Sequence, residues 1–89
     1  MPYSERDIVF DELLVMQYKA GDKRAMDLLM KRWTKRIVMY IFINTKSMEA
    51  SKDIGREVWI VALKKIHHLS DTMKVGSWLL AIAHYKSMD

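Results

Sequence analysis

Cysteine is missing from this sequence altogether, and its 89 residues contain only one proline and three glycines. Without cysteine, neither a disulfide framework nor a thiolate-bound metal can form, and the composition fits a reducing cytoplasm. Scarce proline and glycine suit a mostly helical chain, because both residues disfavour helix interiors. The longest apolar run, residues 37–43, is far too short to span a bilayer. The polar, charged N-terminal stretch does not resemble a secretory signal peptide.

The usual signatures of catalysis and cofactor binding are also absent. There is no Gly-rich phosphate loop, and no serine lies in a nucleophile-elbow context. His67 and His68 are adjacent, so on a helix they point about 100° apart, and His84 lies on a different predicted helix. The sequence therefore predicts no enzyme, metal, cofactor, small-molecule substrate or membrane partner.

What the chain does have is apolar content and a mild positive charge. Apolar residues make up 51% of it, which predicts a folded protein, and its length predicts a single domain over residues 1–89. The formal net charge of +4 permits a nucleic-acid partner without requiring one.

Periodicity and capping signals predict four helices. Residues 1–6 form a short arm, and helices follow at about 7–20, 23–44, 51–69 and 77–89. Gly21 is suited to end the first helix and Asp22 to cap the second, while Ser47 and Ser51 are both possible caps for the third. Residues 70–76 are predicted to form a loop. Short connections between four helices predict an all-α, compact antiparallel bundle.

Apolar positions at helical spacing predict which sides of the first three helices are buried, with Trp33 and Trp59 in the core. The first helix offers Val9 or Phe10, Leu13, Leu14 and Gln17; the second Met26, Leu29, Trp33, Ile37 and Tyr40; the third Ile54, Val58, Ala62, Ile66 and Leu69, flanked by Trp59 and Val61. The cations of the second helix predict a solvated face: Arg24, Lys31, Lys35, Arg32 and Arg36. Residues 37–43 are apolar on all sides, which is typical of a helix covered by several neighbours or by a partner.

The polar side of the third helix allows two interpretations. An isoleucine, Ile60, lies among charges of both signs: Asp53, Arg56, Glu57, Lys64 and the neighbouring His67. An ordinary solvated face with one exposed apolar residue is the simpler interpretation. The alternative is a docking face, in which a single apolar anchor is surrounded by charges.

Four motifs occur in order along the chain: Asp11-x-x-Leu14-Val15, Gly21-Asp22-x-x-Ala25, Asp53-x-x-Arg56-Glu57-Val58-Trp59 and Trp78-Leu79-x-x-Ile82-Ala83. Together they resemble region 2 of bacterial RNA polymerase sigma factors, and most nearly the extracytoplasmic-function class. The separation of 19 positions between Trp59 and Trp78 also agrees with that family. The resemblance covers nearly the whole chain, from about residue 7 to its end.

The resemblance implies two binding sites. In this family the third helix binds a coiled coil of the polymerase β′ subunit, through positions that here are Asp53, Arg56, Glu57, Ile60 and Lys64. The following loop and fourth helix engage the non-template strand of the promoter's minus-ten element. The corresponding positions here are Leu69, Ser70, Asp71, Lys74, Ser77, Trp78, Tyr85 and Lys86. Such a site takes an unstacked base into a pocket and follows the strand with basic and aromatic groups. The family also implies an anti-sigma protein as a further partner.

The chain departs from the family pattern at two positions. Arg56 stands where the family usually has Gln, and Tyr85 where it usually has Asn. We expect the chain to be one domain of a longer, two-domain factor. Two other interpretations stay open: a helical protein-interaction module without DNA recognition, and a basic helical DNA binder without a polymerase partner. For Trp78, a core position is an alternative to a base contact.

Overall fold

The computed structural model describes residues 2–88, and all regular structure in that range is helical. The four α-helices are α1 (Glu5–Lys19), α2 (Lys23–Thr45), α3 (Met48–Lys65) and α4 (Val75–Ser87). Two short 3-10 turns, η1 (Ile66–His68) and η2 (Thr72–Lys74), join α3 to α4. The predicted all-α fold with four helices is therefore confirmed.

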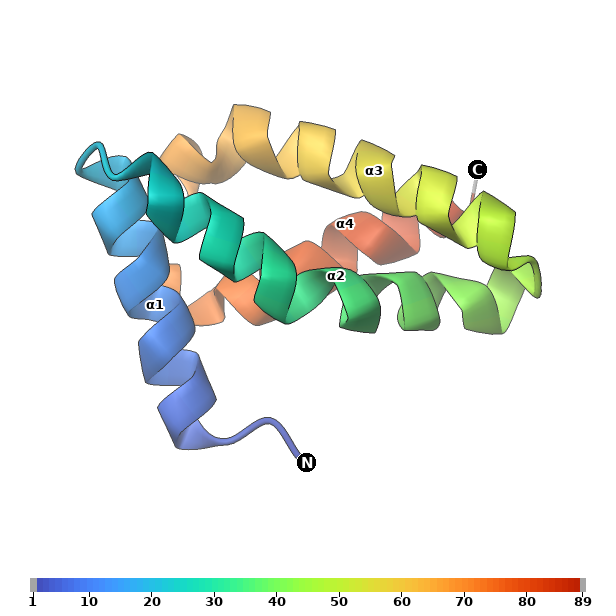
Figure 1. Cartoon of the computed structure of the whole chain (residues 1–89), viewed down its shortest axis with the longest axis horizontal. Coiled ribbons are helices and arrows are strands. Elements are labelled where there is room, and N and C mark those ends of the chain that lie inside the picture. Colours follow the sequence, from blue (N-terminus) through green and yellow to red (C-terminus); the bar gives the residue numbers. More distant parts are fainter. Residues whose placement is uncertain (1, 89) are drawn as a thin grey trace.

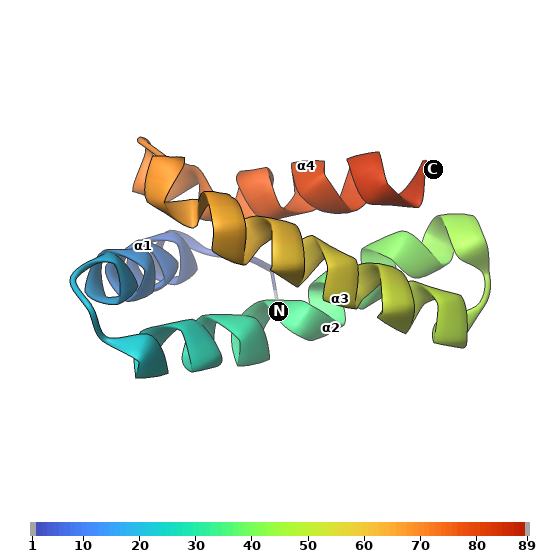
Figure 2. The ribbon, with the colours of Figure 1, turned by 90° about the horizontal axis from the view of Figure 1, so that it is seen from above.

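The helices do not all run along one axis. As Figure 1 shows, α3 runs antiparallel to both α2 and α4, whereas α1 crosses steeply at one end of these three helices. The view from above shows α3 crossing over α2 with α4 alongside α3, and α1 at the end where α2 begins (Figure 2). The antiparallel arrangement thus holds for three helices, and α1 closes one end of the bundle.

Capping residues explain where the helices begin and end. Gly21 has a φ of +110°, which ends the α1 segment, and the Asp22 side chain accepts a hydrogen bond from the Arg24 backbone at the start of α2. Of the two candidates for α3, Ser47 is the cap, and its hydroxyl accepts from the Ala50 backbone at 3.2 Å. The predicted start at residue 51 is therefore three residues late.

The predicted N-terminal arm is too long, because α1 begins at Glu5 rather than residue 7. Ser4 and Asp7 form a capping box: the Ser4 backbone donates to the Asp7 carboxylate at 2.9 Å, and the Asp7 backbone donates to the Ser4 hydroxyl at 3.3 Å. This reciprocal pair satisfies two backbone donors that a helix start otherwise leaves unpaired.

The core confirms both predicted tryptophans, since Trp33 is 3% exposed and Trp59 is 5% exposed. Around them are the fully buried side chains of Leu29, Ile37, Ile41, Val58, Ala62, Ile66, Val75, Leu79 and Ala83. Residues 37–43 are only partly covered, however: Met39 is 46% exposed and Ile43 is 71% exposed. One side of the C-terminal half of α2 therefore stays apolar and open to solvent.

Of the predicted stripe of α1, only Leu14 is buried. Val9, Phe10, Leu13 and Gln17 are exposed, and the other buried side chains of the helix are Val15 and Asp11. A fully buried aspartate explains the difference. The prediction from apolar periodicity treated every carboxylate as exposed to water. Here the Asp11 carboxylate faces the core, and this sets the rotation of α1 about its own axis.

We call Tyr3, Asp7, Asp11, Arg32 and Trp33 the Asp11 cluster. The Asp11 carboxylate accepts hydrogen bonds from the Tyr3 hydroxyl at 2.6 Å, from Nε1 of Trp33 at 2.8 Å and from Nε of Arg32 at 2.6 Å. The other side of the Arg32 guanidinium pairs with Asp7 at 3.0 Å. Arg32 is therefore not a solvated charge, which corrects the prediction for this side of α2.

Gly76 lets α4 approach the tryptophan of this cluster. A Cβ atom at this position would lie 2.7 Å from Cζ2 of Trp33, and the Trp33 ring is fixed by its hydrogen bond to Asp11. We predict that Gly76→Ala lowers the free energy of unfolding by about 1–3 kcal/mol, because the added methyl overpacks the core. Urea titration followed by circular dichroism measures this.

The matched control is Gly55→Ala on α3. Its new Cβ would meet only Cγ2 of Val38, at 3.2 Å, and alanine gains helix propensity over glycine. This variant should change stability less than Gly76→Ala. Equal stability of Gly76→Ala and the wild type would contradict the packing argument.

The Asp11 cluster also predicts a pH dependence. Hydrogen bonds from the Ser4 backbone and the Arg32 guanidinium lower the pKa of Asp7 from 3.8 to about 2. A carboxylate with a lowered folded-state pKa stabilises the protein above its unfolded pKa, and this contribution disappears as the pH falls from about 3.8 to about 2. We therefore expect Asp7→Asn to be less stable than the wild type near neutral pH, with a difference that shrinks over this interval. Urea titrations across the interval measure it, with Asp27→Asn, an exposed carboxylate outside the cluster, as control.

Candidate functional site

The five residues predicted to bind the polymerase lie together on the outer side of α3. We call Asp53, Arg56, Glu57, Ile60 and Lys64 the docking face. All five are exposed, and Ile60 is 53% exposed although it is apolar. The Arg56 guanidinium forms an ion pair with Asp53 one turn away. The opposite side of the helix, with Val58, Ala62 and Ile66, is fully buried, so this face can be occupied without disturbing the core.

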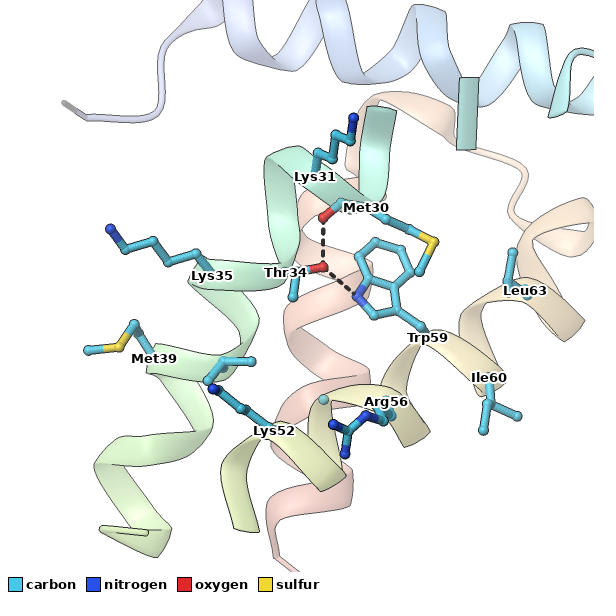
Figure 3. Close-up of a pocket in the computed structure, with 12 residues that line it drawn as sticks. Met30, Lys31, Thr34, Lys35, Met39, Lys52, Arg56, Trp59, Ile60 and Leu63 are labelled. Carbon is cyan, nitrogen blue, oxygen red and sulfur yellow. Dashed lines mark hydrogen bonds between the residues drawn. The ribbon is translucent and has the colours of Figure 1, made fainter. Parts of the chain in front are cut away.

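Beside the docking face is a groove that the sequence analysis missed. This α2–α3 groove has a volume of about 790 Å³ and is lined by Met30, Lys31, Thr34, Lys35, Val38, Met39, Lys52, Gly55, Arg56, Trp59, Ile60 and Leu63. In Figure 3, Trp59 reaches from α3 to Thr34 on α2, and its Nε1 donates to the Thr34 hydroxyl at 3.1 Å. That hydroxyl donates in turn to the Met30 carbonyl at 2.6 Å. The indole is thus fully hydrogen-bonded, and it presents an apolar surface to the groove.

The residues predicted to contact DNA fall in three separate places. The first is the connection between α3 and α4, which spans residues 66–74 and not the predicted 70–76, because α3 ends at Lys65 and not at Leu69. Residues 72–74 form a 3-10 turn, and α4 begins at Val75, so Val75 and Gly76 are buried helix residues and not loop residues. Asp71 caps the turn by accepting from the Met73 backbone at 3.2 Å and lies 3.9 Å from the Lys74 ammonium.

Helix α1 holds this connection in place from one side. The Lys19 ammonium donates to the Leu69 carbonyl at 2.6 Å, and the Thr72 hydroxyl donates to the Glu12 carboxylate at 2.9 Å. The Tyr18 and His67 rings are also close, with centroids 5.7 Å apart. These three contacts join residues far apart in the sequence, and no local pattern could have predicted them.

The second place is the surface between α3 and α4. Here Trp78, Tyr85 and Lys86 border a hollow of about 450 Å³, which we call the α3–α4 groove, together with Val61, Lys64, Lys65, Ala81 and Ile82. Tyr85 is 69% exposed, whereas Trp78 is half-buried and packs against the core. Trp78 therefore makes a core contact and is partly exposed, and its contact with a base stays a prediction. Lys64 belongs to this groove as well as to the docking face.

Ser77 lies apart from these residues. It lines a different hollow, of about 550 Å³, next to Tyr3, Trp33 and Arg36. The Arg36 guanidinium lies over both aromatic rings there, at 5.0 Å from the Tyr3 centroid and 5.1 Å from the Trp33 centroid. Hence the structure groups Trp78, Tyr85 and Lys86 but separates Ser77 from them.

Within residues 2–88, no cluster of three His, Cys, Asp or Glu side chains could hold a metal ion. His84 faces Tyr40, with Nδ1 3.2 Å from the Tyr40 hydroxyl. No helix in the same range is long and apolar enough to cross a membrane.

Comparison with known proteins adds one relative. The chain is 29% identical over 73 residues to the RNA polymerase sigma-H factor of Pseudomonas aeruginosa, a match that covers 82% of this chain and 38% of that protein. The chain therefore spans less than half the length of this curated relative. No family model and no solved structure matches the chain. The similarity to a sigma factor, together with the four-helix fold, supports a sigma-factor domain.

Proposed function

We propose that this chain is a region 2-like domain of a sigma factor of the extracytoplasmic-function class. In this proposal it docks on core RNA polymerase through α3, engages the promoter's minus-ten element through the end of α3 and α4, and acts in the cytoplasm. It is a binding domain and not a catalyst. The sigma factor similar to this chain and the four motifs in family order support it.

The observation that carries the proposal is the exposed apolar anchor of the docking face. Ile60 is 53% exposed in the middle of α3, between the charged residues Arg56, Glu57 and Lys64. An apolar side chain surrounded by charges of both signs is the usual arrangement of a binding hot spot with a polar rim. The partner proposed for it is the β′ coiled coil. Because the Arg56 guanidinium is already paired with Asp53, it would present that pair, and not a free cation, to the partner.

The α3–α4 groove supports the promoter contact. Single strands bind where basic groups follow the phosphates and aromatic rings stack on bases. Lys64, Lys65 and Lys86 supply the positive charge, and Tyr85 supplies an exposed ring. The connection at residues 69–71 would hold the flipped base, and its contacts with Lys19 and Glu12 would keep the backbone there in position.

The first test of this function is Ile60→Asp. The side chain faces away from the core, so the variant should keep the helical circular dichroism spectrum and the unfolding midpoint of the wild type within a small margin. Binding to the isolated β′ coiled coil, measured by calorimetry, should fall by at least about tenfold, because a charge replaces the apolar anchor.

Val9→Asp is the matched control, since Val9 is an exposed apolar residue on α1, away from α3. It should bind the coiled coil like the wild type. Unchanged binding by a folded Ile60→Asp variant would refute the docking face, and a loss of folding would show that its assignment to the surface is wrong.

The second test concerns DNA and is made in complex with core polymerase, where weak strand contacts can be measured. Tyr85→Ala should weaken binding to a minus-ten single strand by about 1–3 kcal/mol through lost stacking. Lys86→Ala should reduce the salt dependence of binding, by about 0.7 in the slope of log K against log salt. Met88→Ala, an exposed residue beyond the groove, is the control. If Tyr85→Ala and Lys86→Ala both leave affinity and slope unchanged while β′ binding survives, the domain is a polymerase-interaction module that does not contact DNA.

A further inference from the structure

The side chains that line the α3–α4 groove offer hydrogen-bond donors and almost no acceptors. Its charged members are Lys64, Lys65 and Lys86, and none of them forms an ion pair within residues 2–88. Trp78 can add only an indole N–H donor. Among the lining residues of the described range, Tyr85 alone has a side chain that can also accept. A ligand in this groove therefore meets no carboxylate or amide oxygen from these side chains.

A lining of donors cannot distinguish one nucleic-acid base from another. Each of the four bases carries at least one ring-nitrogen or carbonyl acceptor, so a lysine ammonium finds a partner on any of them. The exocyclic amino donors of adenine and cytosine can be recognised only by an acceptor, such as an amide or carboxylate oxygen. Lysine is also a point charge on a flexible stem, so it does not fix the geometry of a base edge. The cations of the groove thus bind a strand without selecting its sequence.

The ring of Tyr85 is equally tolerant. It is 69% exposed, and stacking on an aromatic face accepts every base because every base has a π-face. The tyrosine hydroxyl both donates and accepts, so it rejects neither kind of group on a base edge. An asparagine amide, in contrast, holds a donor and an acceptor side by side and pairs with adenine in particular. Tyr85 therefore supplies contact with a base but no means of choosing one.

We infer that the α3–α4 groove binds single-stranded DNA without selecting its bases, with Lys65 and Lys86 on the phosphates and Tyr85 stacked on whichever base lies beside it. This inference rests on the proposed function and deepens it, because it names the class of strand that this surface accepts. Any selection among promoters then depends on the connection at residues 69–71 and not on the groove.

The probes are fluorescein-labelled DNA strands of about nine nucleotides that are abasic except for one central base, which is A, C, G or T. A fifth strand is abasic throughout. A single base cannot stack on neighbouring bases, and it is the only base that Tyr85 can contact. Fluorescence anisotropy measures binding to the whole chain at low ionic strength, where contacts with phosphates are strongest.

The four base-carrying strands should bind the wild type with dissociation constants within about threefold of one another. All four should bind at least about fivefold more tightly than the abasic strand, because the base stacks on Tyr85. Tyr85→Ala should remove this advantage for all four bases alike, whereas Tyr85→Phe, which keeps the ring and loses the hydroxyl, should bind like the wild type. Lys65→Ala should weaken all five strands. Met88→Ala, an exposed residue beyond the groove, is the control and should change nothing.

A preference of more than about tenfold for one base by the wild type would overturn the inference and leave the promoter contact standing. So would a Tyr85→Ala variant that keeps the full advantage of the base-carrying strands. If no strand binds, not even the abasic one, the promoter contact and this inference both fail, and binding of a glutamate-rich peptide in their place would identify a protein ligand. None of these mixtures contains polymerase, so the outcome is independent of β′ docking.

Discussion

The position of α1 depends on one buried carboxylate. Asp11 is fully buried, and a buried charge is tolerated only where hydrogen bonds and opposite charge replace water. Three donors do so here: Tyr3 from the N-terminal stretch, and Arg32 and Trp33 from α2. Burial and the hydrogen bond to Asp11 raise the pKa of the Tyr3 hydroxyl. Burial by itself would lower the pKa of the Arg32 guanidinium, but the hydrogen bonds from Arg32 to Asp11 and Asp7 outweigh burial, so the pKa of Arg32 is raised. Both groups therefore keep their protons, and the cluster persists across the neutral range.

This cluster also determines the arrangement of elements further along the chain. The Trp33 ring that is fixed by Asp11 lies against Gly76, so the same contact sets how closely α4 approaches α2. With α1 fixed at the end of the bundle, Glu12 and Lys19 reach Thr72 and Leu69 in the connection before α4. The proposed base-binding segment is thus held by Glu12 and Lys19 of α1, a helix whose own position depends on Asp11.

Much of this fold could be predicted because it follows helical periodicity. The cap at Asp22, the buried tryptophans and the exposed side of α3 follow from local spacing, whereas that spacing did not decide between Ser47 and Ser51 as the cap of α3. The rotation of α1 could not be predicted, because it depends on a polar contact with residues 21 and 22 positions away. The α2–α3 groove was missed for a similar reason. The cations of α2 were predicted to be solvated, and only the packing of α3 beside them shows that they border an apolar surface. The binding roles of the docking face and of the residues from Leu69 to Lys86 stay predictions.

The distribution of charge around α3 suggests why one helix could serve two different ligands. Its outer surface carries both signs, with Asp53 and Glu57 among the cations, whereas the grooves on its two sides are lined by cations alone among the charged residues of the described range. The two grooves differ in their aromatic residues. On the α2 side, the Trp59 ring is buried and contributes only an apolar floor, which suits aliphatic side chains. On the α4 side, Tyr85 is 69% exposed and can stack on a base. Within the proposed function, it is therefore the exposed Tyr85 ring, and not positive charge alone, that makes the α4 side the one suited to a nucleic-acid strand.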